Sequence, residues 1–415
     1  MFGSAPGDTS GSGGRGKILR VVGVIRRVAG ALLRHAPLGP EQRRLLLSVR
    51  ACRTPALGGE VLFCPHCGQV KEVFHSCRNR HCPNCQAQTQ DVWIAKRAEA
   101  MLPVPHFHVV FTLPSQLRAL CRVYPRPMYD LLLRSCGDVL VELGEDVLKA
   151  QLGVTIVLHT WTRDLSYHVH AHCIVSAGGW DRAAQLFRPV RRKGYLFPAA
   201  RMKAMFRTRL LRGLRGLVQQ GVVTLPADIT FPAIEASLPD TKRWVVHIEP
   251  PFGMFQHVLA YLGRYTHRVG ISNSRLHDVT DDEVTFATRD GKTCTLSHDQ
   301  FTRRFLQHVL PDGFKKIRHY GLYASGATQH QAALAALPQP PPPSTPQDHP
   351  DTPRLDSSDT ASQTAPREPI WRERRCPNCG VPLVLFIQMP RPPRLPWRPP
   401  CPVSYTHLRA HETVL

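Results

Sequence analysis

The 415-residue chain has no long hydrophobic run and few acidic residues, and both absences limit what it can be. No apolar stretch approaches the roughly 18 residues that a membrane-spanning helix needs. The segment from Met1 to Gly16 is rich in glycine and serine and lacks the apolar centre of a signal peptide, so we expect no secretion. Asp and Glu number 31 against 53 Lys and Arg, a formal charge of +22. This excess favours a polyanionic partner, nucleic acid first and an anionic membrane second.

The positive charge is concentrated in two stretches that contain almost no acid. Lys17–Arg53 has nine Lys or Arg and one Glu, and Arg182–Ala227 has eleven and no acid. Both stretches carry apolar residues at helical spacing, such as Leu210, Leu211 and Leu214. Each could be an ordinary solvated helix. Two such stretches in one chain favour a track for a polyphosphate.

Composition divides the chain into six parts, and from Pro105 to about Gly326 it alternates strand-like and helix-like segments. We expect a disordered tail (1–16), a basic helix plus zinc-binding domain (17–100), a globular domain that would hold the chemistry (101–326), a Pro-rich linker (327–375) and a partial zinc knuckle (376–402). The first eleven of residues 403–415 can be encoded by a string that looks like a sequencing adapter, so we expect an assembly artefact over this stretch. A genuine short tail is the alternative.

Clustered cysteines predict a structural zinc site. Six of the 13 cysteines fall between Cys52 and Cys85, and in a chain that is not secreted this indicates metal ligation rather than disulfides. Two Cys-x-x-Cys knuckles separated by fourteen residues can supply four thiolates to one tetrahedral zinc ion: Cys64, Cys67, Cys82 and Cys85. Spare ligands leave room for exchange or a second ion: Cys77, His75, His81 and Cys52. Buried free thiols are the alternative.

A third knuckle, Cys376 with Cys379, is half of such a site. Cys401 is one candidate to assist it, and a partner knuckle beyond the end of this sequence is another. Basic residues accompany the first cluster, as expected for a zinc module that binds nucleic acid, and Arg78 and Arg80 are the nearest of them.

Four histidines predict a site for a catalytic ion on a β-hairpin. Val154–Trp161 is apolar and β-branched, Tyr167–Val175 alternates strictly, and a short turn joins them. His168, His170 and His172 then share one face. His159 lies opposite His170, and opposed residues have Cβ atoms about 5 Å apart. We expect His159, His170 and His172 to bind one divalent ion that acts as a Lewis acid, with His168 in reserve. A single structural histidine on a strand would be ordinary, but a group of four is not.

Two tyrosines at helical spacing are candidate nucleophiles. Phe255–Tyr265 reads as a helix, and Tyr261 and Tyr265 stand at i and i+4 on one face. Alone they would read as aromatics packed on a sheet. Arg264 and Arg268 lie beside them in sequence and can neutralise phosphate, and a tyrosine can attack phosphorus that a metal ion has made more electrophilic.

These motifs together resemble a known family, the rolling-circle transposases of the insertion-sequence-91 type, the two-tyrosine branch of the His-hydrophobe-His (HUH) endonucleases. The resemblance covers roughly residues 45–325. It rests on Ser76–Gln86 (SCRNRHCPNCQ), Phe107–Pro114 (FHVVFTLP), His159–Trp161 (HTW), His170–His172 (HAH), Tyr261–Val269 (YLGRYTHRV) and Phe305–Leu322 (FLQHVLPDGFKKIRHYGL).

The resemblance implies an α+β fold of the HUH type, an antiparallel sheet flanked by helices, preceded by the small zinc-binding domain. It implies Mg²⁺ or Mn²⁺ at the histidines, with His159 as third ligand. One tyrosine would cleave single-stranded DNA to give a 5′-phosphotyrosine and a free 3′-hydroxyl, and the other would act at the next strand transfer. Two positions depart from the family pattern: Ala171 is small for its hydrophobic position, and His168 stands where Pro is frequent, so the ligand register stays open.

The partners implied are single-stranded DNA at element ends and target, with no membrane and no nucleotide cofactor, in a bacterial cytoplasm next to the nucleoid. The residues expected to contact DNA are Arg78, Arg80, Arg191, Arg192, Lys193, Arg264 and Arg268. Four alternatives stay open. They are a related replication initiator or relaxase, a zinc hydrolase that uses the histidines, a zinc-ribbon DNA-binding protein without catalysis, and an element fragment with degraded activity. The hydrolase lacks a nearby general base, because Asp164 lies in the turn and Glu249 is far in sequence.

Overall fold

The computed structural model describes residues 20–85, 100–192, 194–251, 270–289, 291–337 and 374–391. The chain forms two compact units, each made of two segments. The large unit takes residues 1–50 and 78–365, and the small unit takes 51–77 and 366–415. This division differs from the boundaries expected from composition, because the basic N-terminal helix belongs to the large unit and the C-terminal knuckle shares a unit with residues 51–77.

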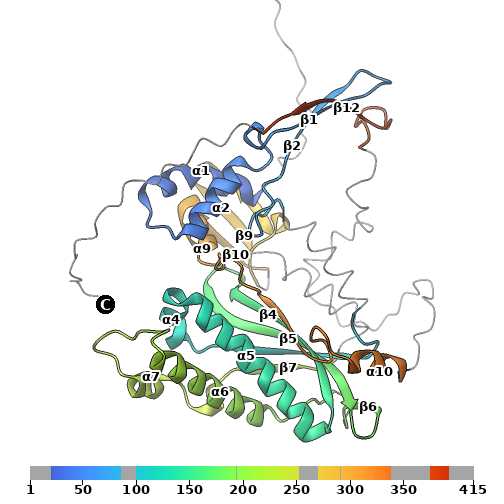
Figure 1. The fold of residues 1–415 in the computed structure, drawn as a ribbon. Helices are drawn as coiled ribbons and strands as arrows, with labels where there is room; N and C mark the ends of the chain where they lie inside the picture. Colours follow the sequence, from blue (N-terminus) through green and yellow to red (C-terminus); the bar gives the residue numbers. More distant parts are fainter. Residues whose placement is uncertain are drawn as a thin grey trace, which may run out of the picture. The chain divides into compact units, whose positions relative to one another are not determined.

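The large unit is built on a six-stranded antiparallel sheet of order β11-β4-β5-β3-β7, with β6 paired to β5 (Figure 1). The strands are β3 (His106–Thr112), β4 (Gln151–Trp161), β5 (Tyr167–Asp181), β6 (Leu186–Pro189), β7 (Val246–Glu249) and β11 (Ile317–Gly321). The expected hairpin is confirmed as β4 and β5, and His159 pairs with His170 in its register. The mixture of helices and antiparallel strands confirms the α+β fold class.

Alternation along the strands gives this sheet two different faces. Odd positions of β3 such as Phe107 and Val109, and even positions of β4 such as Ile156, are fully buried in the main core. Helices α5 (Pro125–Leu143) and α6 (Ala199–Gln219) supply the other half of that core and lie along this face of the sheet (Figure 1). The opposite face carries the histidines, so the apolar core fixes the backbone positions of the polar site.

Smaller elements complete the large unit. A second antiparallel sheet of order β10-β9-β8 joins β8 (Leu276–Val279), β9 (Glu283–Ala287) and β10 (Thr293–Ser297). The remaining α-helices are α1 (Val21–His35), α2 (Pro40–Ala51), α4 (Arg118–Val123), α7 (Phe231–Ser237), α9 (His298–Leu306) and α10 (Gln329–Ala335). Short 3-10 turns and one π turn are Pro55–Leu57, Ser115–Leu117, Gly144–Leu148, Thr241–Arg243 and Asn273–Arg275. None of the described helices is long and apolar enough to cross a membrane.

The linker expected from residue 327 begins later than composition indicated. Helix α10 occupies Gln329–Ala335, and Ala333 is fully buried beside Trp180 and Tyr323. The alanines that made this stretch resemble a linker are good helix formers, and a small side chain fits closely against the aromatic rings. Residues 338–373 of the expected linker, and the adapter-like residues 403–415, lie outside the described residues.

The small unit is a three-stranded antiparallel sheet of order β12-β1-β2. Its strands are β1 (Gly59–Phe63), β2 (Val70–Phe74) and β12 (Val384–Met389). The central strand therefore pairs with a strand more than 300 residues away in sequence. The sheet joins the segment that follows α2 to the segment that holds the third knuckle.

Candidate functional site

Three imidazoles meet on the polar face of the large sheet. His159 on β4 pairs with His170 on β5, and His172 follows two residues along β5 on the same face. Each residue offers one ring nitrogen, and these three nitrogens all lie within 4.8 Å of one another. The ring centroids of His159 and His172 are 4.2 Å apart, and those of His159 and His170 are 5.4 Å apart. The three side chains named from the sequence can therefore converge on one ion.

The hydrogen bond of His170 fixes which of its nitrogens is available. Its Nδ1 lies 2.9 Å from the backbone carbonyl oxygen of His168. A carbonyl oxygen only accepts, so Nδ1–H donates and the neutral ring presents the lone pair of Nε2. His168 thus contributes its backbone rather than its imidazole, and it is not part of the converging group of three.

A chain of two further residues fixes His172 in the same way. Nδ1 of His108 on β3 lies 2.7 Å from Oε2 of Glu249 at the end of β7, and its Nε2 lies 2.7 Å from Nδ1 of His172. The carboxylate accepts from Nδ1–H of His108, so an uncharged His108 ring accepts at Nε2 from Nδ1–H of His172. Nε2 of His172 then carries a lone pair toward the group. A carboxylate–His arrangement behind a ligand is how proteins orient metal-binding imidazoles.

The site holds its histidines in the neutral form that metals bind. Burial, followed by the charges of neighbouring imidazoles, lowers the pKa of His159 and of His172 well below 6.5. Burial also lowers the pKa of His170 to about 4. Adjacent protonated imidazoles would repel one another in a site of low polarity. The donor set therefore fits a divalent ion, which requires neutral imidazole nitrogen.

Sequence reasoning missed three residues of this site. Glu249 was set aside as distant in sequence, yet its carboxylate contacts His108, and the His108 bond holds the pKa of Glu249 below its usual range. The available signal was a pair of histidines two residues apart on one strand, His106 and His108, which indicates that both face the same side of the sheet. Lys316 was also missed: burial lowers its pKa to about 7, and its charge helps to lower the pKa of His159.

The structure groups the thiols of the knuckles differently from the four-cysteine site expected from the sequence. The thiols of Cys64 and Cys67 meet those of Cys376 and Cys379 within the small unit. Cys82 and Cys85 belong to the large unit, where the N–H of Cys85 donates to the carbonyl of Cys82 at 2.9 Å. Spacing within each knuckle was informative, but neighbouring knuckles in sequence need not be neighbours in space.

Four of the residues expected to contact DNA are exposed: Arg78, Arg80, Arg191 and Arg192. Arg80 also donates to the carbonyl of Phe314 at 2.9 Å. On α6 the arginines of the acid-free stretch meet acids from other elements: Arg201 with Asp146, Arg209 with Glu142, and Arg207 and Arg215 with Glu235. Because α6 also buries its leucines, much of this stretch serves packing, and the simple polyphosphate track is not supported along α6.

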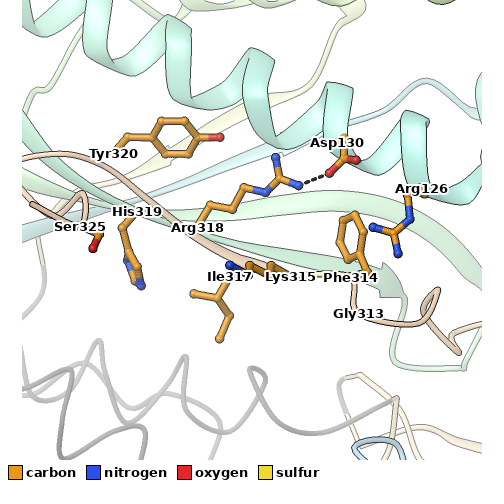
Figure 2. Close-up of a pocket in the computed structure, with 10 residues that line it drawn as sticks. All are labelled: Arg126, Asp130, Gly313, Phe314, Lys315, Ile317, Arg318, His319, Tyr320 and Ser325. Carbon is orange, nitrogen blue, oxygen red and sulfur yellow. Dashed lines mark hydrogen bonds and ion pairs between the residues drawn. The ribbon is translucent and has the colours of Figure 1, made fainter.

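A groove follows the edge strand β11 beside the histidine strand β4. Arg126, Lys315 and Arg318 supply positive charge, and Arg318 forms an ion pair with Asp130 (Figure 2). Ile317 pairs with Val157 of β4, two residues from His159. The groove is therefore lined by the strand that neighbours, in the sheet, the strand carrying His159.

Several predicted site residues lie outside the described residues. They are Tyr261, Tyr265, Arg264, Arg268, Lys193 and Cys401. Their roles remain predictions. The described residues on either side of the tyrosine segment are placed: Glu249 contacts His108, and Gly270 packs against Leu165 in the turn between β4 and β5.

Comparison with known proteins places the chain among transposases. A family model described as "Putative transposase" matches residues 153–331, and one described as "Transposase zinc-binding domain" matches residues 24–113. The chain is 37% identical over 329 residues to "Putative transposase y4qJ" of Sinorhizobium fredii, covering 75% of this chain and 82% of the relative. It is 28% identical over 308 residues to the "Transposase for insertion sequence element IS801" of Pseudomonas savastanoi pv. phaseolicola, covering 71% and 73%. No solved structure matches.

The resemblance seen in the motifs is confirmed by these matches. The zinc-binding domain model, together with the grouped cysteines, supports structural zinc in the chain. The chain belongs to the family of transposases of the insertion-sequence-91 type.

Proposed function

We propose that this transposase nicks and rejoins single-stranded DNA by rolling-circle chemistry, with Tyr261 and Tyr265 as nucleophiles and a divalent ion at the three histidines. The observation that carries the proposal is the convergence of three neutral imidazoles, two of which have their Nε2 lone pairs set by hydrogen bonds. The neighbouring Cys173 thiol is buried in the main core, and the Thr160 hydroxyl is bonded to His308. Such a set therefore suits electrophilic activation of a phosphate that is attacked by a group from elsewhere.

Mg²⁺ or Mn²⁺ suits this role, because an ion held by His159, His170 and His172 would polarise a phosphoryl oxygen. The protein's own contribution is to fix ligand orientation. His108 and Glu249 hold His172, and the His168 carbonyl holds His170. The carbonyl of Lys316 accepts from the N–H of Leu158, the residue before His159, at 2.8 Å. A cationic Lys316 there would stabilise a phosphate with growing negative charge.

The tyrosine step conserves the phosphodiester energy. The phenolic oxygen of one tyrosine attacks phosphorus and loses its proton, the bond from phosphorus to the 3′-oxygen breaks, and that oxygen takes up a proton as a 3′-hydroxyl. Reversal with another 3′-hydroxyl rejoins the strand, so no ATP is required. The second tyrosine accepts the next strand. The described residues that flank the tyrosine segment support the choice of these nucleophiles. Glu249, at the end of β7, contacts His108, and Gly270 contacts Leu165 in the hairpin turn.

The proposed partner is single-stranded DNA. The groove along β11 offers exposed Lys315 with Arg126 and Arg318, and it runs beside the strand that carries His159. Exposed Arg191 and Arg192 follow β6. Basic grooves that track a flexible backbone are typical of single-strand binding.

The test uses a hairpin oligonucleotide that carries an element end, incubated with the full chain and Mn²⁺. Its label is at the 3′ end, because the fragment joined to tyrosine through its 5′-phosphate keeps that end. We expect a covalent protein–DNA adduct with wild type and with either single Tyr→Phe variant, and none with Tyr261→Phe plus Tyr265→Phe. His170→Ala plus His172→Ala should abolish cleavage while most of the single-strand affinity persists, because cations dominate binding.

Two outcomes would point elsewhere. Tyrosine-independent cleavage that leaves free 5′-phosphate ends would support a metal-dependent hydrolase. DNA and zinc binding without an adduct on any element end would support a binding module. Loss of single-strand affinity in the double-histidine variant equal to the loss of cleavage would contradict the division between binding and chemistry.

A further inference from the structure

Two distant knuckles of the small unit have the same local structure. In the first, the N–H of Cys64 donates to the Gln69 carbonyl at 2.9 Å and the N–H of Gly68 donates to the Cys64 carbonyl at 3.0 Å. In the second, Cys376 donates to Val381 at 2.8 Å and Gly380 to Cys376 at 2.9 Å. Both sequences read Cys-Pro-x-Cys-Gly.

The glycine of each knuckle is required by the turn. Gly68 has φ of 71° and Gly380 has φ of 73°, a left-handed conformation that favours glycine. This turn directs the two thiols of a knuckle to one side. Two identical turns, each with its thiols directed together, form the two halves of a tetrahedral thiolate site.

The four sulfur atoms have the spacing of zinc ligands. Sγ of Cys64 lies 3.5 Å from Sγ of Cys379, and Sγ of Cys67 lies 3.5 Å from Sγ of Cys376. Sγ of Cys67 and of Cys379 are 3.6 Å apart. A disulfide would need about 2.05 Å. Four sulfurs about 2.3 Å from a central ion in a tetrahedron are about 3.8 Å apart, close to what is observed.

Strand pairing brings the two knuckles together independently of the thiols. Phe63, the last residue of β1, pairs with Val384, the first residue of β12, so each knuckle sits at the same end of this ladder. The rings of Phe63 and Phe386 are 6.2 Å apart, and Arg374 forms an ion pair with Glu60. Cys64 and Cys376 are both buried, with 0% and 3% of their surface exposed.

We propose that one structural zinc ion holds the small unit together through four thiolates, those of Cys64, Cys67, Cys376 and Cys379. The site unites residues 309 to 315 positions apart. The match to the zinc-binding domain model ends at residue 113, so the second knuckle lies outside it. Folding of the small unit then requires the C-terminal segment, and zinc binding supplies the free energy that offsets closing so long a loop.

Zinc stoichiometry of the full chain tests this inference through non-additivity. Zinc per chain is measured after dialysis for wild type, for Cys64→Ser plus Cys67→Ser, for Cys376→Ser plus Cys379→Ser, and for the quadruple variant. Each double variant should lose one equivalent of zinc, and the quadruple variant should lose the same single equivalent. Cys294→Ser, which alters a partly exposed cysteine of β10, is the matched control and should lose none.

Loss of two equivalents in the quadruple variant would overturn the proposal, because each knuckle would then hold its own ion. No loss in the Cys376/Cys379 variant would overturn it equally.

A second measurement does not depend on variants that may misfold. The wild-type chain is alkylated during stepwise chelation and the labelled cysteines are identified by mass spectrometry. We expect the four thiols to become reactive together, including Cys67, which is exposed and would react early if it were not bound. Labelling of Cys376 and Cys379 while Cys64 and Cys67 stay protected would contradict a shared ion.

Discussion

His108 and His172 lie diagonally across β3 and β5, with Nε2 of the first 2.7 Å from Nδ1 of the second. The Glu249 carboxylate behind His108 sets the direction of both hydrogen bonds. A residue that does not belong to the converging group of three therefore determines which nitrogen one of its members presents.

His108→Ala should weaken Mn²⁺ binding about 10- to 100-fold, the usual cost of losing a partner that orients a metal ligand. Calorimetric titration measures it, with Mn²⁺ added to chain that keeps its structural zinc and holds no ion at the three histidines. The matched control is His106→Gln, two residues earlier on the same strand, because His106 bonds Tyr323 instead. Glu249→Gln, which keeps an acceptor, should weaken binding less than Glu249→Ala. Equal effects of His108→Ala and the control would refute the orienting role.

Lys316→Met should lower the rate of cleavage about 100-fold, because removing one charge that stabilises a transition state costs that order of magnitude. Mn²⁺ affinity should not fall, since the removed cation repels the ion. Single-turnover cleavage and metal titration are compared in the same variants. Lys316→Arg should recover part of the rate. A rate for Lys316→Arg as low as that for Lys316→Met would show that the charge is not the cause.

Lys315→Ala should reduce the salt dependence of single-strand binding. Each lost phosphate contact lowers the slope of log affinity against log salt by about 0.7. Fluorescence anisotropy with a labelled oligonucleotide at several salt concentrations gives the slope. Lys149→Ala is the control, because Lys149 is exposed beyond the opposite end of α5 from Arg126. An unchanged slope in Lys315→Ala would remove the β11 groove from the binding path.

Stability should fall as the pH drops from about 6.5 toward 4. Burial lowers the pKa of His106 and of His308 to about 4 and that of His81 to about 3. In the unfolded chain these histidines are protonated near pH 6.5, whereas in the folded protein they stay neutral to much lower pH. Their contribution to the free energy of unfolding is therefore complete above pH 6.5, and it is lost as the pH falls toward their pKa values in the folded protein. Each histidine contributes up to about 1.4 kcal/mol per pH unit.

Urea unfolding at pH 7.5 and pH 5.0 checks this expectation, with chain that keeps its structural zinc and holds no ion at the three histidines. His308 bonds Thr160 and the Leu165 carbonyl, so His308→Gln should lower stability at pH 7.5 but make the decline with pH shallower. A decline as steep as that of wild type would assign the pH dependence to other groups.

The histidine hairpin could be predicted because its information is local. Alternation over Tyr167–Val175, a short turn and a second β-branched segment determine both strands and place His159 opposite His170. The hydrogen bonds by which His108 and Glu249 orient His172 could not be predicted in this way. They depend on β3 lying next to β5 and β7 next to β3, an order of strands that no local pattern reveals.

The spatial grouping of the cysteines could not be predicted for the same physical reason. Each Cys-x-x-Cys turn is dictated by its own residues, but the choice of partner depends on β1 pairing with β12 across most of the chain. The charge of α6 was also a poor guide to DNA contacts. The number of arginines on this helix does not reveal that acidic residues of α5 and α7 form ion pairs with them.

Peptide mapping of the covalent adduct tests the central claim most directly. The chain is incubated with a single-stranded element end and Mn²⁺, digested with nuclease and protease, and the peptide that carries the 5′-phosphonucleotide is sequenced by mass spectrometry. The account predicts modification on Tyr261 or Tyr265, dependent on His159, His170 and His172. Modification of any other residue, or adduct formation that persists when these histidines are replaced, would contradict it.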